Sequence, residues 1–124
     1  MVRETHKFKV SVSDQNYYIV EIKDNCEFEI DDLKQLVAFE KEISGKVMPV
    51  LVICAFTAQT NNELITYLSK NANNPYCKAE AFIITSLAQK ILANVYLKFT
   101  TPERPVKFFK KKEEGIKWLE KYIE

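Results

Sequence analysis

Three consecutive lysines, Lys110, Lys111 and Lys112, form the most concentrated charge in the sequence. They precede "EEGIKWLEKYI", whose apolar spacing predicts a helix. Their charge therefore lies at a helix N-terminus, where the helix dipole favours anions. A bound phosphate or an acidic partner would compensate the unfavourable positive charge at this helix N-terminus. The alternative is that the lysines are solvated and that Glu113 and Glu114 satisfy the dipole.

Other residue types capable of chemistry are few and scattered. Cys26, Cys54 and Cys77 are widely spaced, which is typical neither of a disulfide framework nor of a zinc site. Cys54 lies in an aliphatic run, which indicates a small buried apolar residue. His6 is the only histidine, and the two glycines of the sequence exclude a Gly-rich phosphate loop. No matched acid and base stand out. The sequence therefore predicts a protein that is not an enzyme and needs no metal or cofactor.

Composition narrows the classes of partner. The 124 residues suit one domain, 1–124, and 47% hydrophobic with 28% charged residues is ordinary for a folded protein. The net charge of +1, from 18 basic and 17 acidic side chains, argues against nucleic-acid binding. No apolar run approaches the ~20 residues that cross a bilayer, and no signal-peptide core is visible, so we expect a cytoplasmic protein without stable membrane insertion.

The N-terminal part predicts a hairpin followed by a helix and a buried strand. "HKFKVSV" and "YYIVEI" alternate apolar and polar residues around the turn-forming "SDQN". A helix is expected over residues 32–44, with Asp31 and Asp32 as acidic charges at its entry rather than metal ligands, and Gly45 closing it. "VMPVLVICAF" lacks alternation and predicts a strand covered on both faces.

The remainder alternates helices and strands. Thr60 and Glu63 have the spacing of a capping box for a second helix, and Ser86 and Gln89 repeat that spacing for a third, which continues to about Phe99. "KAEAFIIT" and "VKFF" predict two more strands, and a last helix follows. Strands joined through helices favour parallel pairing. The predicted fold class is α/β, a mixed sheet of about five strands with about four helices distributed over its faces.

The third helix carries an unusually broad apolar face. At ~100° per residue, its apolar side chains cover about half of the circumference. We interpret this as a helix that lies between the sheet and a neighbouring helix and touches both. Leu97 projects away from that face, so a contact between two copies of the chain is one alternative. A peripheral membrane helix is another, although Lys90 and Lys98 are few for that purpose.

The C-terminal half carries a family resemblance in three pieces, "SLAQKILAN" after an alanine-containing strand, the link "KFTTPERPVK" and the final "EEGIKWL". Over about Val47–Ile123 the sequence resembles bacterial STAS-like proteins, the sulfate-transporter and anti-sigma-factor-antagonist type, and especially their uncharacterised SpoIIAA-like branch. The resemblance implies a non-enzymatic regulatory module that binds another protein or, as in related SEC14-like domains, an apolar ligand.

In the sigma-factor antagonists, a phosphorylated serine lies in an Asp-Ser-Ser/Thr-Gly type motif at the start of a helix. The matching segment here is "CAFTAQTNNE", which lacks both the aspartate and the glycine. Thr57 and Thr60 are the hydroxyls available for phosphorylation. For Thr60 the simpler explanation is that it caps the second helix.

Two functions follow as expectations. The first is a module that binds a protein partner through the loops at the strand ends, where the candidate contact residues are Phe56, Thr57, Gln59, Thr60 and Ser86. The second is a carrier or sensor of a lipid or other apolar small ligand, suggested by the aromatic residues around the third helix. One observation separates them. If Leu92, Val95 and Phe99 line an open hollow or lie exposed to solvent, the protein-docking interpretation has to be given up.

Overall fold

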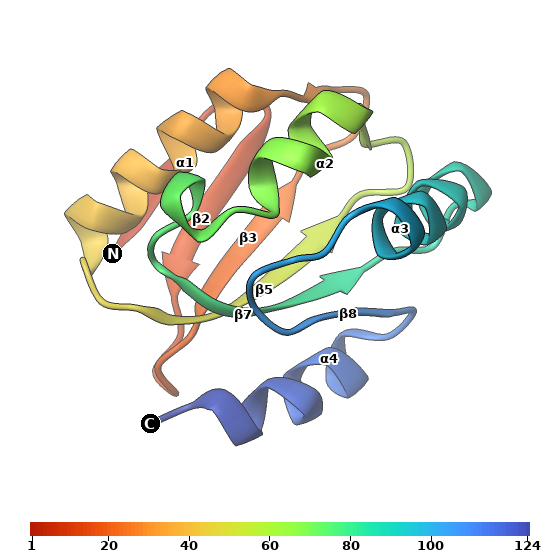
Figure 1. Cartoon of the computed structure of the whole chain (residues 1–124). Helices are drawn as coiled ribbons and strands as arrows, with labels where there is room; N and C mark the ends of the chain where they lie inside the picture. Colours follow the sequence, from red (N-terminus) through yellow and green to blue (C-terminus); the bar gives the residue numbers. More distant parts are fainter.

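A six-stranded mixed sheet organises the chain, and the computed structural model describes all residues, 1–124. The strand order is β1-β2-β3-β5-β7-β8 (Figure 1). β1 to β3 pair antiparallel, and β3, β5, β7 and β8 pair parallel. The strands are β1 (Val2–Glu4), β2 (Phe8–Val12), β3 (Tyr18–Ile22), β5 (Met48–Cys54), β7 (Cys77–Ile83) and β8 (Val106–Phe109). The parallel strands follow from the helical connections between them, because a chain must cross over to re-enter the sheet in the same direction.

The helices cover the two faces of the sheet unequally. Figure 1 shows α1, α2 and α3 on one side of the sheet and α4 on the other. The helices are α1 (Ile30–Ile43), α2 (Asn62–Leu68), α3 (Leu87–Phe99) and α4 (Lys112–Leu119), with single 3₁₀ turns at Asn71–Asn73 and Glu120–Tyr122. A two-stranded sheet of β4 (Glu27–Phe28) and β6 (Gln59–Thr60) joins the entries of α1 and α2. The predicted α/β class, with helices on both faces, is confirmed.

The predicted hairpin is confirmed as β2 and β3, with Val10 opposite Val20. Asn16 in the intervening turn has a positive φ of 66°, a conformation that asparagine tolerates well. The sequence interpretation missed β1, a three-residue strand at the edge of the sheet. Its residues are mostly exposed, so β1 carries no clear apolar alternation that a pattern could detect.

β5 is the central strand and is covered on both faces, as its unbroken aliphatic run predicted. Val50 and Val52 belong to the large apolar core beneath α1 and α2. Leu51 belongs to the smaller core on the α4 side and is fully buried. Pro49 lies at the second position of the strand, where the pairing with β7 shifts register, so its missing N–H disturbs only the start of the ladder.

The helix ends follow the predicted signals with one exception. Gly45 closes α1 with a φ of +71°, and a capping box joins Ser86 to Gln89 at the start of α3. The capping role predicted for Thr60 is wrong. Asn61 is the N-cap of α2, and its side chain accepts a hydrogen bond of 2.8 Å from the backbone N–H of Leu64. Thr60 instead pairs in β6 and its hydroxyl donates to the carbonyl oxygen of Phe28, because strand pairing, which the capping pattern ignores, occupies that residue.

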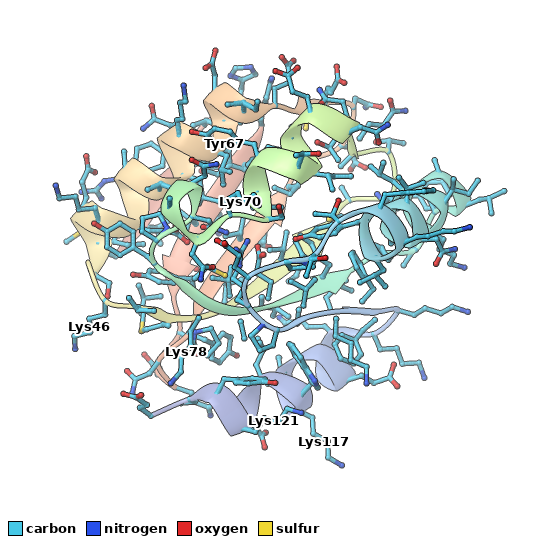
Figure 2. The ribbon with its side chains drawn as sticks, viewed as in Figure 1. Lys46, Tyr67, Lys70, Lys78, Lys117 and Lys121 are labelled. Atoms are coloured by element: carbon cyan, nitrogen blue, oxygen red, sulfur yellow. The ribbon has the colours of Figure 1, made fainter.

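The α4 helix packs closely on the sheet through Gly115. A Cβ atom at this position would lie 2.7 Å from Cδ1 of Ile83 and 3.2 Å from Cδ1 of Leu51. Glycine therefore allows the helix backbone to approach the two strands directly. Figure 2 shows the opposite side of the helix, where Lys117 extends away from the sheet.

Replacing Gly115 with valine is expected to lower the free energy of unfolding by about 2–3 kcal/mol, because the added atoms overpack a filled core. Urea unfolding followed by the fluorescence of Trp118 measures this change. Lys117→Val is the matched control, since it introduces the same side chain on the exposed side of the same helix and should change stability by less than about 1 kcal/mol. Equal effects of the two substitutions would contradict close packing at Gly115.

Candidate functional site

A cavity of about 580 Å³ separates the sheet from the helices on the α1–α3 side. It is lined by 28 residues, of which 21 are hydrophobic. Its floor includes Val20, Val52 and Phe82 from three adjacent strands, and its other walls come from α1, α2 and α3. Well-packed protein interiors contain few voids much larger than a water molecule. A cavity of this volume is in the range of small-molecule binding sites, ~300–1,000 Å³.

The α3 helix forms one wall of the cavity and is only partly buried. Ala93 and Tyr96 are its buried residues, and the Tyr96 ring contacts Phe108 of β8 edge-on, with 6.1 Å between the ring centroids. α3 also contacts α2. The prediction that this helix touches both the sheet and a neighbouring helix is therefore confirmed. Its broad apolar face, however, is not covered by them.

Leu92 and Val95 line the cavity, and Phe99 is 74% exposed to solvent. The condition set out for giving up the protein-docking interpretation is therefore met. Leu87 and Ile91 are also exposed on α3, as is Leu97 on its other side. The apolar face is wide because part of it faces the cavity and part faces solvent, an arrangement that periodicity cannot distinguish from burial between two elements.

The N-terminus of α3 is tied to the loop after β5 by Gln89. Its Nε2 donates to the carbonyl oxygens of Ala55 at 2.7 Å and Ala58 at 3.1 Å. Its Oε1 accepts from the backbone N–H of Ser86 at 3.3 Å, which completes the capping box. These bonds hold α3 at this end without filling the space beneath it with side chains.

The cavity opens to solvent between the start of α2 and α3. Four of its lining residues are themselves exposed: Gln59 on β6, Asn62 on α2, and Ala88 and Ile91 on α3. A residue that both lines the cavity and is exposed marks its mouth. The mouth of the cavity is therefore partly apolar. An apolar molecule can reach the interior through it without unfolding the sheet.

Polar groups from separate elements also line the cavity. They include Glu40 of α1, Glu80 of β7 and Tyr96 of α3. Glu80 forms a buried ion pair with Arg104, whose Nη2 and Nε donate to Glu80 Oε1 at 2.6 and 3.0 Å. Arg104 also donates to the carbonyl oxygen of Leu68 at 2.6 Å. Oε1 of Glu40 and the hydroxyl of Tyr96 are buried and have no hydrogen-bond partner in the protein.

The environment changes the acid–base behaviour of these groups. Burial, together with the nearby charge of Glu80, raises the pKa of Glu40 to about 8, with Arg104 opposing the shift. Burial also raises the pKa of Glu80, while the charge of Arg104 and its hydrogen bonds oppose that effect. Burial is again the main cause that raises the pKa of Tyr96, followed by the charge of Glu80. Near neutral pH the Glu40 carboxyl is therefore protonated and the Tyr96 phenol is neutral.

The residues predicted to contact a partner lie in one region but have different roles. Gln59 and Thr60 line the cavity near its mouth, whereas Phe56 is 64% exposed. The Thr57 hydroxyl donates to Asp24 Oδ1 at 2.9 Å and accepts from the backbone N–H of Asn25 at 2.8 Å, which fastens the turn after β3. Ser86 is buried and caps α3. Phosphorylation at Thr57 or Thr60 stays a prediction.

The lysine cluster lies apart from the cavity. Lys110, Lys111 and Lys112 are exposed, with Lys111 as the N-cap of α4 and Glu113 and Glu114 in its first turn. Their place at the start of the last helix is confirmed, and anion binding by them stays a prediction. No group of three or more His, Cys, Asp and Glu residues is arranged to hold a metal ion.

Sequence reasoning missed the polar residues of the cavity, although two of them carried a signal. Glu40 follows Leu33 and Leu36 at helical spacing, so a carboxylate shares the buried side of α1. Glu80 interrupts the apolar residues of β7. A charged residue on an apolar face is uncommon unless it has a partner or a function. This rule would have identified both glutamates as candidate site residues. Tyr96 and Arg104 carried no comparable signal.

The cysteines show no sign of an activated thiol. All three are free, and Cys54 lines the cavity. Burial raises the pKa of the Cys54 thiol to about 12. The thiolate is the nucleophilic form of cysteine, so Cys54 acts as a small apolar wall residue near neutral pH.

In none of the helices is there a run of apolar residues long enough to cross a lipid bilayer.

Comparisons with known proteins agree with this architecture. A family model described as "Domain of unknown function (DUF7793)" matches residues 13–123. No curated protein matches the chain significantly. A solved structure similar to it is an uncharacterised protein of the DUF3478 family from Shewanella loihica PV-4, described as having a SpoIIAA-like fold. The two share 17% sequence identity with a TM-score of 0.54, over 96% of this chain and 98% of the other.

The likeness extends beyond the segment from which the STAS-like resemblance was drawn, because it includes the N-terminal hairpin. At this level of identity it shows the fold alone. The predicted SpoIIAA-like arrangement of a mixed sheet and four helices is confirmed. The chain belongs to the DUF7793 family, and its fold is SpoIIAA-like.

Proposed function

We propose that this protein is a non-enzymatic STAS-like module that binds an apolar small molecule in the cavity beneath α2 and α3. The observation that carries the proposal is the cavity itself, about 580 Å³ with 21 hydrophobic residues among the 28 that line it. Removing an apolar molecule from water into such surroundings is favourable by roughly 25 cal/mol per Å² of buried surface. The protein-partner alternative is not retained, because the side chains expected to cover the sheet line a cavity or lie in solvent instead.

Volume and access set the size of the ligand. An engineered apolar cavity of ~150 Å³ in another protein is large enough for benzene. The cavity here is several times larger, so it suits a molecule with a long aliphatic chain or several rings. Its mouth beside Ile91 and Asn62 provides a route of entry. The hydrogen bonds of Gln89 hold the start of α3 beside this mouth.

Binding rather than catalysis fits the chemistry of the lining. The only thiol among the lining residues, Cys54, has a pKa raised to about 12 by burial. Glu80 is held by Arg104 in a buried ion pair. Neither group is activated as a nucleophile near neutral pH, and no histidine lines the cavity to act as a base. Glu40 has a raised pKa, but its Oε1 has no hydrogen-bond partner in the protein with which to exchange a proton.

A bulky substitution in the cavity tests the proposal. Val52→Phe is expected to weaken binding of the apolar fluorophore N-phenyl-1-naphthylamine at least tenfold, because the added ring occupies part of the site. Titration of the fluorophore against wild-type and variant protein measures the change. Val47→Phe is the matched control, since Val47 is 59% exposed and does not line the cavity, and it should leave the affinity unchanged.

Two further measurements complete this test. The thermal unfolding of Val52→Phe shows whether the variant is folded, and Leu92→Trp offers a second obstruction from the α3 wall. Native mass spectrometry of the freshly purified wild-type protein, before and after solvent extraction, should reveal a bound apolar molecule. Absence of fluorophore binding to folded wild-type protein, with nothing released on extraction, would rule the proposal out.

A further inference from the structure

The cavity contains two polar side chains that the protein itself leaves unsatisfied. Oε1 of Glu40 and the hydroxyl of Tyr96 have no hydrogen-bond partner, and the two residues are only 1% and 3% exposed. Buried polar groups in folded proteins are nearly always hydrogen-bonded, so each exception needs an explanation. Both residues line the cavity. A polar group of a ligand in the cavity would supply the missing partner for these atoms.

The two unsatisfied groups are influenced by the same charges. Glu40 and Tyr96 line the same cavity as Glu80, which is paired with Arg104, and this ion pair also influences the pKa of both groups. Glu40 belongs to α1 and Tyr96 to α3, and Figure 1 shows these two helices on either side of α2. Glu40, Glu80 and Tyr96 therefore add polar groups to the wall of a mainly apolar cavity. An elongated ligand would place its polar end at these groups and its apolar part along α2 and α3.

The charges nearby decide which polar end is accepted. No lysine, arginine or histidine is among the residues that line the cavity. The guanidinium of Arg104 is already bound to Glu80, to the carbonyl oxygen of Leu68 and to Oδ1 of Asn71. A ligand carboxylate or phosphate would thus be buried without a free counter-charge and close to Glu80, which is strongly unfavourable.

The unsatisfied groups present donors and acceptors together. A protonated Glu40 offers one O–H and a carbonyl oxygen, and Tyr96 offers a hydroxyl that both donates and accepts. A ligand hydroxyl matches this set, because it also donates once and accepts. An ammonium group would require Glu40 to ionise against its burial and against the charge of Glu80. Tyr18, whose hydroxyl donates to the carbonyl oxygen of Lys46 at 2.8 Å, is already partnered and does not compete.

We propose that the ligand of the cavity is an aliphatic or polycyclic molecule with an uncharged hydroxyl end, which hydrogen-bonds to the Glu40 carboxyl and the Tyr96 hydroxyl. This inference rests on the proposed function and specifies its ligand class. It distinguishes a long-chain or polycyclic alcohol from a fatty acid, a phospholipid headgroup or an alkylamine. The selection arises from hydrogen bonding without a counter-charge.

Displacement of N-phenyl-1-naphthylamine by three ligands of equal chain length tests the inference at pH 7. 1-Decanol is expected to displace the fluorophore at a concentration at least tenfold lower than decanoate or decylamine. A tenfold ratio corresponds to about 1.4 kcal/mol. The charge of the polar end is the main difference between the three compounds, so their ranking reports on the polar part of the site.

Variants connect that ranking to the two side chains. Tyr96→Phe and Glu40→Leu should each weaken 1-decanol about fivefold to tenfold relative to any change in the affinity of the fluorophore. Glu40→Gln is the conservative control, because its amide keeps a donor and an acceptor, and it should retain 1-decanol binding within threefold. Unfolding curves recorded for each variant exclude loss of structure as the cause.

The outcomes separate the two proposals. Failure of folded wild-type protein to bind the fluorophore or any of the three compounds would overturn the proposed function. Fluorophore binding with decanoate or decylamine as strong as 1-decanol would leave the cavity as a binding site and overturn only the hydroxyl selection. Unchanged 1-decanol affinity in both Tyr96→Phe and Glu40→Leu would likewise reject the assigned hydrogen bonds.

Discussion

Replacing Arg104 with methionine is expected to lower the free energy of unfolding by about 3–5 kcal/mol. The guanidinium donates to Glu80 Oε1 at 2.6 and 3.0 Å, and the two side chains are only 2% and 4% exposed. Without it the Glu80 carboxylate is buried with no counter-charge, and it must be protonated or reach water. The carbonyl oxygen of Leu68 also loses its donor. Urea unfolding at pH 7 measures the loss.

Two comparisons make this prediction specific. In the double variant Glu80→Leu/Arg104→Met the unpaired charge is absent, so much of the lost stability should return, since buried ion pairs can often be replaced by apolar residues at little net cost. Arg3→Met is the matched control in the exposed pair with Glu42, 3.0 Å apart, and should change stability by less than about 1 kcal/mol. A similar, small effect at both arginines would contradict the structural role of Arg104.

The stability of the protein should decrease as the pH rises from about 4.5 to about 8, because of Glu40. Its pKa is 4.5 when exposed to solvent and is raised to about 8 in the folded protein, mainly by burial. Between these values the folded state holds a proton that the unfolded chain has released. The free energy of unfolding therefore falls with pH over this window, by roughly 5 kcal/mol from this group, and Glu40 adds no further slope above it.

Glu40→Gln isolates that contribution. Glutamine has nearly the same shape as protonated glutamate and does not titrate, so the variant should match the wild type near pH 4.5 and exceed its stability increasingly towards pH 8. Glu80, Arg104, Tyr18 and Cys77 also interact electrostatically with Glu40. Their own titrations are largely common to both proteins and cancel in the difference. Urea unfolding at several pH values measures the difference in the free energy of unfolding between the two proteins. A difference that stays constant with pH would show that Glu40 is not buried as described.

The elements of the fold were largely predictable, because their signals are local. Unbroken aliphatic residues identified β5, and Ser86 with Gln89 identified the start of α3, since strand burial and helix capping depend on residues close together in the chain. Thr60 was misassigned as a cap because its strand partner, Phe28, is distant in sequence. The edge strand β1 was missed because it is short and mostly exposed.

The candidate site was much less predictable. Gln59 and Thr60 were selected for their place at a strand end, and they lie near the cavity mouth. Glu40 and Glu80, which come from different elements, were not selected at all. Each appeared as an isolated polar residue in an apolar pattern. Only the tertiary structure shows that both line the same cavity and that Glu80 is paired with Arg104.

The sequence by itself determined the α/β class, the hairpin, the alternation of helices and strands and the breadth of the apolar face of α3. The tertiary structure alone decided what that face meets. Periodicity reports which side of a helix is apolar but not the distance to the neighbouring element, and Leu92 would show the same pattern against a filled core or a cavity. The distance between α3 and the sheet depends on packing among distant residues, such as Tyr96 against Phe108 and Gln89 against the loop after β5.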